Sequence, residues 1–204
     1  DVAALCLAAN GIKAYVFESL RPTPELSYAV RKLHTIAGIN ITASHNPPEY
    51  NGYKVYWEDG AQITPPHDSG IMNEVKAISD YAVCKKMDKD AAIAAGLYQT
   101  IGADIDDPYI EELKKLVVHQ DAIDAVGSQI KVVYTPLHGT GNIPVRRVLK
   151  ELGFTNVYVV PEQELPDGDF PTVSYPNPEA KEAFTLGLAL AKKVDADLVL
   201  ATDP

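Results

Sequence analysis

The residues with the clearest chemical potential lie in a polar loop, and Ser44 is at its centre. Residues 37–43 are small, apolar or β-branched, which is typical of a buried strand, and Pro47 has no amide to donate to a sheet. Ser44 is therefore predicted at the carboxyl end of a strand. In open α/β sheets that edge is where ligands bind, so the hydroxyl is well placed for chemistry.

A lysine follows the same loop. Asn51 and Gly52 both tolerate a positive φ, so we expect a tight turn there that returns Lys54 close to Ser44. From Tyr53 the pattern has a period of two. Lys54 and Tyr56 are predicted on the polar face of a strand, with Tyr53, Val55 and Trp57 packing on the other face. Asp59 and Gly60 predict a second hairpin turn.

Three interpretations fit a serine beside a histidine and a lysine. A hydrolase would use Ser44 as a nucleophile, but residues 42–46 lack the Gly-x-Ser-x-Gly elbow. Consecutive residues of an extended chain point to opposite faces, so His45 is predicted to be badly placed to take a proton from Ser44. A serine that carries a phosphoryl group would need a nearby cation and a metal. A solvated turn without chemistry is the remaining alternative.

Four segments resemble one enzyme family. The run TASHNPPEYNGYK, residues 42–54, resembles the phosphoserine loop of the α-D-phosphohexomutases, the phosphoglucomutase/phosphomannomutase superfamily. Residues 135–141, 166–171 and 196–204 resemble further blocks of that family, in the expected order. Residues 53–62 and 65–68 are most similar to the phosphoglucomutase group, which also includes phosphopentomutase-like members.

The resemblance implies a role for each matching residue. Ser44 would be the phosphorylated serine, Lys54 would stabilise charge or move a proton beside the phosphoryl group, and His45 would position substrate or transfer a proton. Asp203 matches the first acid of a magnesium loop, in which three carboxylates and an oxygen of the phosphorylated Ser44 hold one Mg²⁺. The second and third acids and an arginine do not occur after Pro204, so the metal site is expected to be incomplete.

The implied activity is a phosphoglucomutase reaction. Phosphorylated Ser44 would convert glucose 1-phosphate to glucose 1,6-bisphosphate, which would reorient and return its other phosphoryl group, releasing glucose 6-phosphate. Mannose or pentose phosphates are alternative substrates, because the family's sugar-selecting domain is not recognisable here. Both ends of the chain are predicted to be cut, so this chain alone is expected to be a poor catalyst or inactive.

Composition limits the partners. The chain has 204 residues, 46% of them hydrophobic, and its 18 Lys and Arg against 28 Asp and Glu give a net charge of -10. That charge opposes nonspecific binding to nucleic acid or anionic membranes, and no apolar run is long enough for a membrane span. Cys6 and Cys84 form no metal or disulfide pattern, and no secretory leader is recognisable. We therefore expect small sugar phosphates as ligands and a cytoplasmic location.

The predicted fold is α/β, with two three-layer sandwich domains of the phosphohexomutase type, both incomplete, at residues 1–126 and 127–204. In the first, a helix over 2–9, a strand over 12–17, a helix capped by Thr23 and a strand over 37–43 predict a parallel βαβ unit. Further helices are predicted from Asp68 and from Asp107-Pro108. Residues 79–106 are predicted to be irregular with a possible short helix.

The second domain is predicted as βαβαβ. Its strands are expected at 130–134, 157–160 and 198–201, and its helices at 144–152 and 178–193. The Gly139-Thr140-Gly141 turn joins a strand to a helix, which is one feature of a nucleotide-binding module. It lacks the third glycine of a dinucleotide motif, so a close-packed turn is the preferred interpretation. His138 is interpreted as a structural histidine, and Asp167-Gly168-Asp169 as an interdomain loop.

Overall fold

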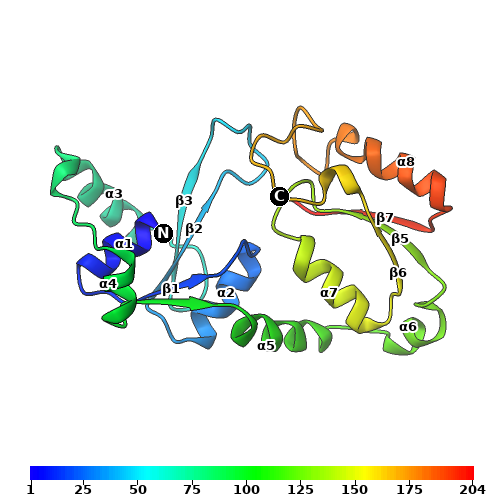
Figure 1. Cartoon of the computed structure of the whole chain (residues 1–204), viewed down its shortest axis with the longest axis horizontal. Helices are drawn as coiled ribbons and strands as arrows, with labels where there is room; N and C mark the ends of the chain where they lie inside the picture. Colours follow the sequence, from blue (N-terminus) through cyan, green and yellow to red (C-terminus); the bar gives the residue numbers. More distant parts are fainter.

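Seven short strands form three sheets in a computed structural model that describes all 204 residues (Figure 1). Strands β1 (Ala14–Phe17) and β4 (Tyr98–Ile101) are parallel, and β2 (Ala37–Thr42) and β3 (Gly52–Trp57) are antiparallel. The third sheet is parallel, with the order β6 (Asn156–Val159), β5 (Lys131–Thr135), β7 (Leu198–Ala201). The fold is α/β, as the sequence predicts.

The chain has eight α-helices. They are α1 (Val2–Ala9), α2 (Thr23–Lys32), α3 (His67–Ala77), α4 (Lys89–Ala94), α5 (Ala103–Lys114), α6 (Gln120–Val126), α7 (Asn142–Leu152) and α8 (Thr185–Val194). Short 3₁₀ helices occur at Tyr81–Val83, Pro161–Gln163 and Lys181–Phe184. Figure 1 shows two halves side by side, with β1 to β4 in one and β5 to β7 in the other.

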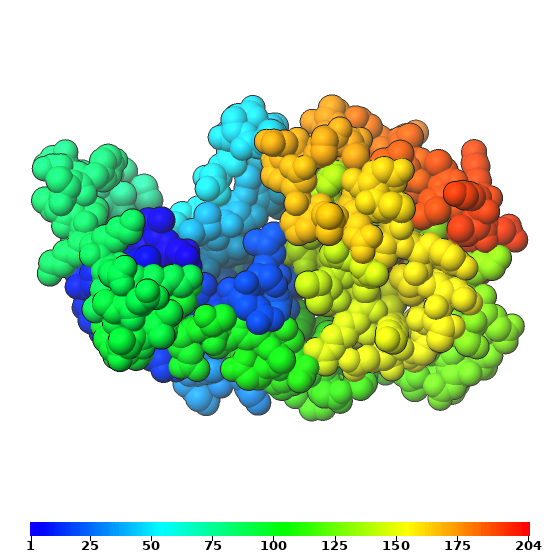
Figure 2. Space-filling view, in the orientation of Figure 1, coloured from blue at the N-terminus to red at the C-terminus, as the bar shows by residue number.

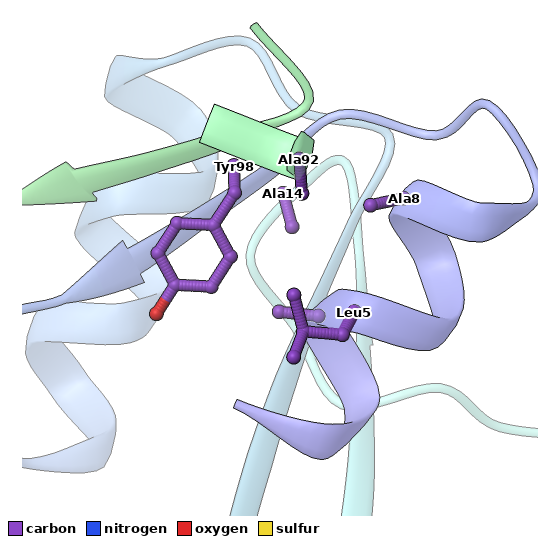
Figure 3. Packing of buried hydrophobic residues seen from close by; sticks show 6 residues of the cluster. Leu5, Ala8, Ala14, Ala92 and Tyr98 are labelled. Carbon is purple, nitrogen blue, oxygen red and sulfur yellow. The ribbon is translucent and has the colours of Figure 1, made fainter. Parts of the chain in front are cut away.

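Small residues build the core beside α1. Ala4, Leu5 and Ala8 of that helix pack with Ala14, Ala92 and Tyr98, and all six are buried (Figure 3). Alanine on the inner face of α1 lets the helix approach β1 and β4 closely, while the Tyr98 ring fills the remaining space. The Tyr98 hydroxyl lies 2.6 Å from an Asp1 carboxylate oxygen, so its polar end is satisfied.

The predicted pairing of the first half was wrong in one respect. The strand that pairs with β1 is β4, and β2 pairs with β3, so no ladder joins β1 to β2. Strand β4 lies in the segment predicted to be irregular. Only its end residues, Tyr98 and Ile101, are buried, so its burial does not alternate and gives no period-two signal.

Two predicted helix starts also need correction. Helix α5 begins at Ala103, not at Asp107-Pro108, and Pro108 lies inside the helix. The Asp104 carboxylate accepts a hydrogen bond from the Gly102 amide, which marks the earlier start. Thr23 is the first residue of α2 rather than its cap, and its hydroxyl accepts a hydrogen bond from Asn40 at 2.6 Å.

The second half has the predicted βαβαβ order, with all strands parallel. Strand β5 lies between its neighbours, and its residues Val132 to Thr135 are at most 1% exposed. A continuous buried run of this kind is typical of a central parallel strand covered on both faces. The helix predicted over 178–193 is interrupted, because Lys181–Phe184 forms a 3₁₀ turn before α8.

The two halves touch through α5 and α7. Arg147 of α7 pairs with Asp107 of α5 at 2.7 Å, and Lys114 pairs with Glu151 at 3.3 Å. These charges are partly exposed, so they specify the approach of the helices more than they stabilise it. No helix of the structure is long and apolar enough to span a bilayer.

A partly buried cluster of charged side chains joins α2 to α5. Arg21 donates to both Asp106 carboxylate oxygens, at 2.8 and 2.6 Å, and these bonds lower the pKa of Asp106. Glu25 is only 1% exposed, and its Oε2 has no hydrogen-bond partner. Burial, followed by the nearby Asp106, raises the pKa of Glu25 from 4.5 to about 8.

This cluster predicts that stability falls as pH rises from about 4.5 towards 8. In that window folded Glu25 keeps a proton that the unfolded chain releases, so the loss is at most about 1.4 kcal/mol per pH unit. Urea unfolding of Glu25→Gln should show a flatter pH dependence, because glutamine stays neutral. Glu58→Gln, at an exposed position, is the matched control. Equal slopes in the wild type and Glu25→Gln would contradict the assignment.

Candidate active site

The loop between β2 and β3 carries the predicted site. Thr42 pairs with Gly52, so residues 43–51 form the connection. Ser44 has a left-handed backbone conformation with φ 54°, and its amide donates to the Thr42 hydroxyl at 2.8 Å. Non-glycine residues rarely adopt this conformation, and in other proteins it is often found at functional positions.

The predicted tight turn at Asn51-Gly52 was wrong. Gly52 is the first paired residue of β3 and does not have a positive φ. A Cβ atom there would lie 2.6 Å from the Thr42 carbonyl oxygen, so the glycine permits a close approach of the two strands. The predicted turn at Asp59-Gly60 is confirmed: Gly60 has φ 79° and is followed by an antiparallel bridge between Tyr56 and Gln62.

Asp203 meets this loop from the other half of the chain. The Ser44 hydroxyl donates to Asp203 Oδ1 at 2.9 Å, across a sequence separation of 159 residues. His45 Nδ1 lies 2.6 Å from Asp203 Oδ2. One carboxylate therefore contacts both neighbouring side chains. In Figure 1 the tip of the β2–β3 hairpin reaches the carboxyl end of the chain.

The expectation that Ser44 and His45 point apart was wrong, because the chain is not extended at Ser44. The Ser44 hydroxyl lies 3.4 Å from His45 Nδ1. That nitrogen also makes the short contact with Asp203, which indicates that it carries the proton. A hydrolase triad instead uses one ring nitrogen for the serine and the other for the acid. The geometry therefore disfavours the hydrolase alternative.

Lys54 lies apart from this contact. It is opposite Asn40 in the β2–β3 ladder, on the face of β3 that also carries the buried Tyr56, while Tyr53 and Trp57 are exposed. No hydrogen bond or ion pair joins Lys54 to Ser44, His45 or Asp203 in the structure. The alternation along β3 is as predicted, but the packing is reversed: the buried residue lies on the face of Lys54, and the face expected to pack is largely exposed. The catalytic role of Lys54 stays a prediction.

The turn after β5 holds the segment that bears Asp203. The Thr140 amide and hydroxyl both donate to the Pro204 main-chain oxygen, at 2.7 and 3.0 Å. An added Cβ at Gly139 would lie 2.1 Å from Pro204 Cα, and one at Gly141 would lie 2.6 Å from the Thr202 hydroxyl. This confirms the predicted close-packed turn and leaves the nucleotide-binding alternative without support.

An aromatic residue also contacts His45. The Tyr175 ring packs edge-on against His45, with ring centroids 5.8 Å apart, and no pattern in the sequence identified Tyr175. Figure 2 shows the hairpin tip beside the loop that contains this tyrosine.

His138 is 5% exposed and contacts the Leu165 carbonyl and the Thr172 hydroxyl, so the prediction of a structural histidine is confirmed.

The predicted metal ligands lie together but are few. Ser44 and Asp203 provide hard oxygen atoms, the type that Mg²⁺ prefers. No group of three or more His, Cys, Asp or Glu side chains in the structure could hold a metal ion. Mg²⁺ commonly keeps several water ligands, so these two residues fit part of a magnesium coordination shell.

Comparisons with known proteins identify the family of this chain. Residues 1–82 match the family model for phosphoglucomutase/phosphomannomutase alpha/beta/alpha domain I, and residues 107–204 match the model for domain II. The chain belongs to the phosphoglucomutase/phosphomannomutase family, the phosphohexomutase superfamily. The boundary predicted between residues 126 and 127 stays a prediction.

Individual relatives carry different names. The chain is 43% identical to a phosphoglucomutase of Staphylococcus saprophyticus, over 97% of this chain and 35% of that protein. It is 41% identical to a phosphopentomutase of Pongo abelii, over 100% of this chain and 33% of that protein. A crystal structure assigned to a phosphomannomutase of Thermus thermophilus superimposes with a TM-score of 0.75 at 27% identity, covering 97% of this chain and 41% of that one. The chain spans about a third of the length of the two curated relatives.

Ser44 and Asp203 both contact Nδ1 of His45, so we predict that Ser44 is not an activated hydrolase nucleophile. A fluorophosphonate probe should leave Ser44 unlabelled, as judged by mass spectrometry of the peptide that contains it. An active serine hydrolase in the same reaction is the positive control. Stoichiometric labelling of Ser44, abolished in Ser44→Ala, would restore the hydrolase interpretation.

Proposed function

We propose that this chain carries the phosphoryl-transfer site of a phosphoglucomutase, which interconverts glucose 1-phosphate and glucose 6-phosphate through glucose 1,6-bisphosphate. The observation that carries the proposal is the contact of Ser44 and His45 with the Asp203 carboxylate, at 2.9 and 2.6 Å. The 43% identity to a phosphoglucomutase supports the choice of sugar.

The proposed chemistry is an exchange at phosphorus. In the first step the bond between phosphorus and Ser44 Oγ breaks, a bond from phosphorus to the O6 hydroxyl oxygen of glucose 1-phosphate forms, and the proton of that hydroxyl ends on Ser44 Oγ. After reorientation, Ser44 Oγ attacks the 1-phosphoryl group, the bond from phosphorus to the sugar O1 breaks, and the Ser44 proton ends on O1. Atoms and charge balance over the two steps, and water must be excluded throughout.

The residues at the site have complementary roles in this proposal. Asp203 accepts the Ser44 hydroxyl hydrogen bond, which orients the oxygen for attack. His45 has no hydrogen-bond partner at Nε2 in the structure, so that atom is available to position the substrate or to transfer a proton. Mg²⁺ bound by Asp203 and an oxygen of the phosphorylated Ser44 would offset negative charge on the transferring group.

A second candidate is a phosphopentomutase or phosphomannomutase. The named relatives favour these alternatives, because the chain is 41% identical to a phosphopentomutase and similar in structure to a protein assigned as a phosphomannomutase. Each acts on a sugar phosphate, so the same Ser44 chemistry serves all three. Comparison of kcat/KM for glucose, mannose and ribose 1-phosphates, in a form of the protein as long as its relatives, decides among them.

The proposal predicts that Ser44 becomes phosphorylated. After incubation with glucose 1,6-bisphosphate and Mg²⁺, intact mass and phosphopeptide mapping should show one phosphate on Ser44, and none in Ser44→Ala. The measurement is made on this chain and on a form as long as its relatives. Absence of phosphate from Ser44 in the longer form would rule out the mutase proposal.

Lys54 gives a second prediction. If its ammonium moves close to the phosphoryl group during transfer, Lys54→Gln should slow phosphorylation of Ser44 by about 100-fold, the usual effect of losing one preorganised charge donor. The rate is measured by quenched-flow mass spectrometry, with Lys54→Arg expected to retain part of it. Lys85→Gln, at an exposed lysine, is the control. An unchanged rate in Lys54→Gln would leave Lys54 a surface residue.

A further inference from the structure

We propose that Thr140 is a positioning residue that holds Asp203 against Ser44 and His45. Thr140 itself touches neither of those residues. Its amide and its hydroxyl both donate to the Pro204 main-chain oxygen, at 2.7 and 3.0 Å. The residue that Thr140 fixes is therefore the immediate neighbour of Asp203.

The other side of Asp203 is fixed as well. The Thr202 amide donates to the Thr135 carbonyl at 3.2 Å, and the Thr202 hydroxyl lies 2.9 Å from the Tyr134 hydroxyl. Tyr134 is fully buried, and burial raises the pKa of its hydroxyl to about 12, so it keeps its proton over the working pH range. We call Thr140, Tyr134 and Thr202 the Asp203 clamp.

Close packing leaves the clamp little freedom. Gly139 and Gly141 have no room for a side chain beside Pro204 and Thr202. The Asp203 side chain, in contrast, is 45% exposed and reaches Ser44 and His45 alone. The main chain of residues 202–204 is thus anchored by the turn after β5, and the carboxylate extends from that anchor to the loop of the other half.

These contacts indicate that the clamp, and not the loop that bears Ser44, sets the position of the Asp203 carboxylate. Only the Asp203 side chain joins the segment 202–204 to Ser44 and His45, while main-chain and side-chain hydrogen bonds join it to β5 and the following turn. The clamp therefore determines where the carboxylate stands, and the loop responds. The catalytic meaning of the clamp rests on the proposed function; its existence does not.

The test compares variants of this chain at fixed pH by NMR of the His45 ring. Asp203→Asn defines the ring signals of a histidine without its acidic partner. Thr140→Val, which removes one of the two donors to Pro204, should move the His45 signals part of the way towards those of Asp203→Asn. Thr140→Ser keeps the hydroxyl and should restore the wild-type signals. Thr100→Val, at an exposed strand threonine, is the matched control.

A second variant guards against misfolding of the first. Tyr134→Phe keeps the buried ring but removes the hydroxyl that contacts Thr202, and it should shift His45 in the same direction. Thermal melts identify any variant that does not fold. Unchanged His45 signals in folded Thr140→Val or Tyr134→Phe would overturn the proposal. So would signals that do not respond to Asp203→Asn, because Asp203 would then not be seated beside His45.

A rate measurement links the clamp to chemistry. In a form that phosphorylates Ser44, Thr140→Val should slow phosphorylation by up to about tenfold, as expected for one lost hydrogen bond. In an Asp203→Asn background the same change should have no further effect, because Thr140 acts through Asp203. Additive effects would overturn this link. If wild-type Ser44 is never phosphorylated, the proposed function fails while the NMR result still decides the clamp.

Discussion

The contact between Ser44 and Asp203 is the interaction on which the site depends. It joins two side chains that are 159 residues apart and that belong to different halves of the molecule. Neither half can form it alone. The contact requires a left-handed backbone conformation at Ser44, where the Ser44 amide donates a hydrogen bond to the Thr42 hydroxyl. It also requires that the main chain of residues 202–204 is held in place by the other half.

Charge explains why a cation belongs in the proposed mechanism. A phosphoryl group on Ser44 would bring roughly two negative charges to an oxygen that now lies 2.9 Å from a carboxylate. The Asp203 side chain is 45% exposed, so solvent screens this repulsion, which would still be on the order of a few kcal/mol at so short a distance. The chain has a net charge of -10, so its overall field gives no compensation. The local sources of positive charge would be a metal ion bound at Asp203 and the ammonium group of Lys54, if it approaches.

Local sequence patterns predicted the parts of the molecule that lie in motifs. The features that were not predicted depend on contacts between residues far apart in the sequence. The motif around Ser44, the strand before it and the βαβαβ order of the second half follow from residue types and periodicity. Strand β4 did not, because only two of its four residues are buried and its partner β1 is more than 80 positions away. The relative orientation of Ser44 and His45 was predicted wrongly, because that prediction assumed an extended chain at a residue with φ 54°. Thr140 lies in a recognised motif and Tyr175 does not, but neither role could be predicted, because the roles arise from contacts with residues 204 and 45.

The two halves contribute to the site in unequal ways. The Asp203 side follows a buried strand and is held by hydrogen bonds within a tightly packed turn. The Ser44 side is the connection of a two-stranded hairpin, with exposed residues at Glu49, Tyr50 and Asn51 and few contacts beyond Asp203 and Tyr175. Local stability follows buried contacts and satisfied hydrogen bonds. Any adjustment between the two partners therefore falls on the loop that bears the serine, while the carboxylate stays as the fixed reference of the site.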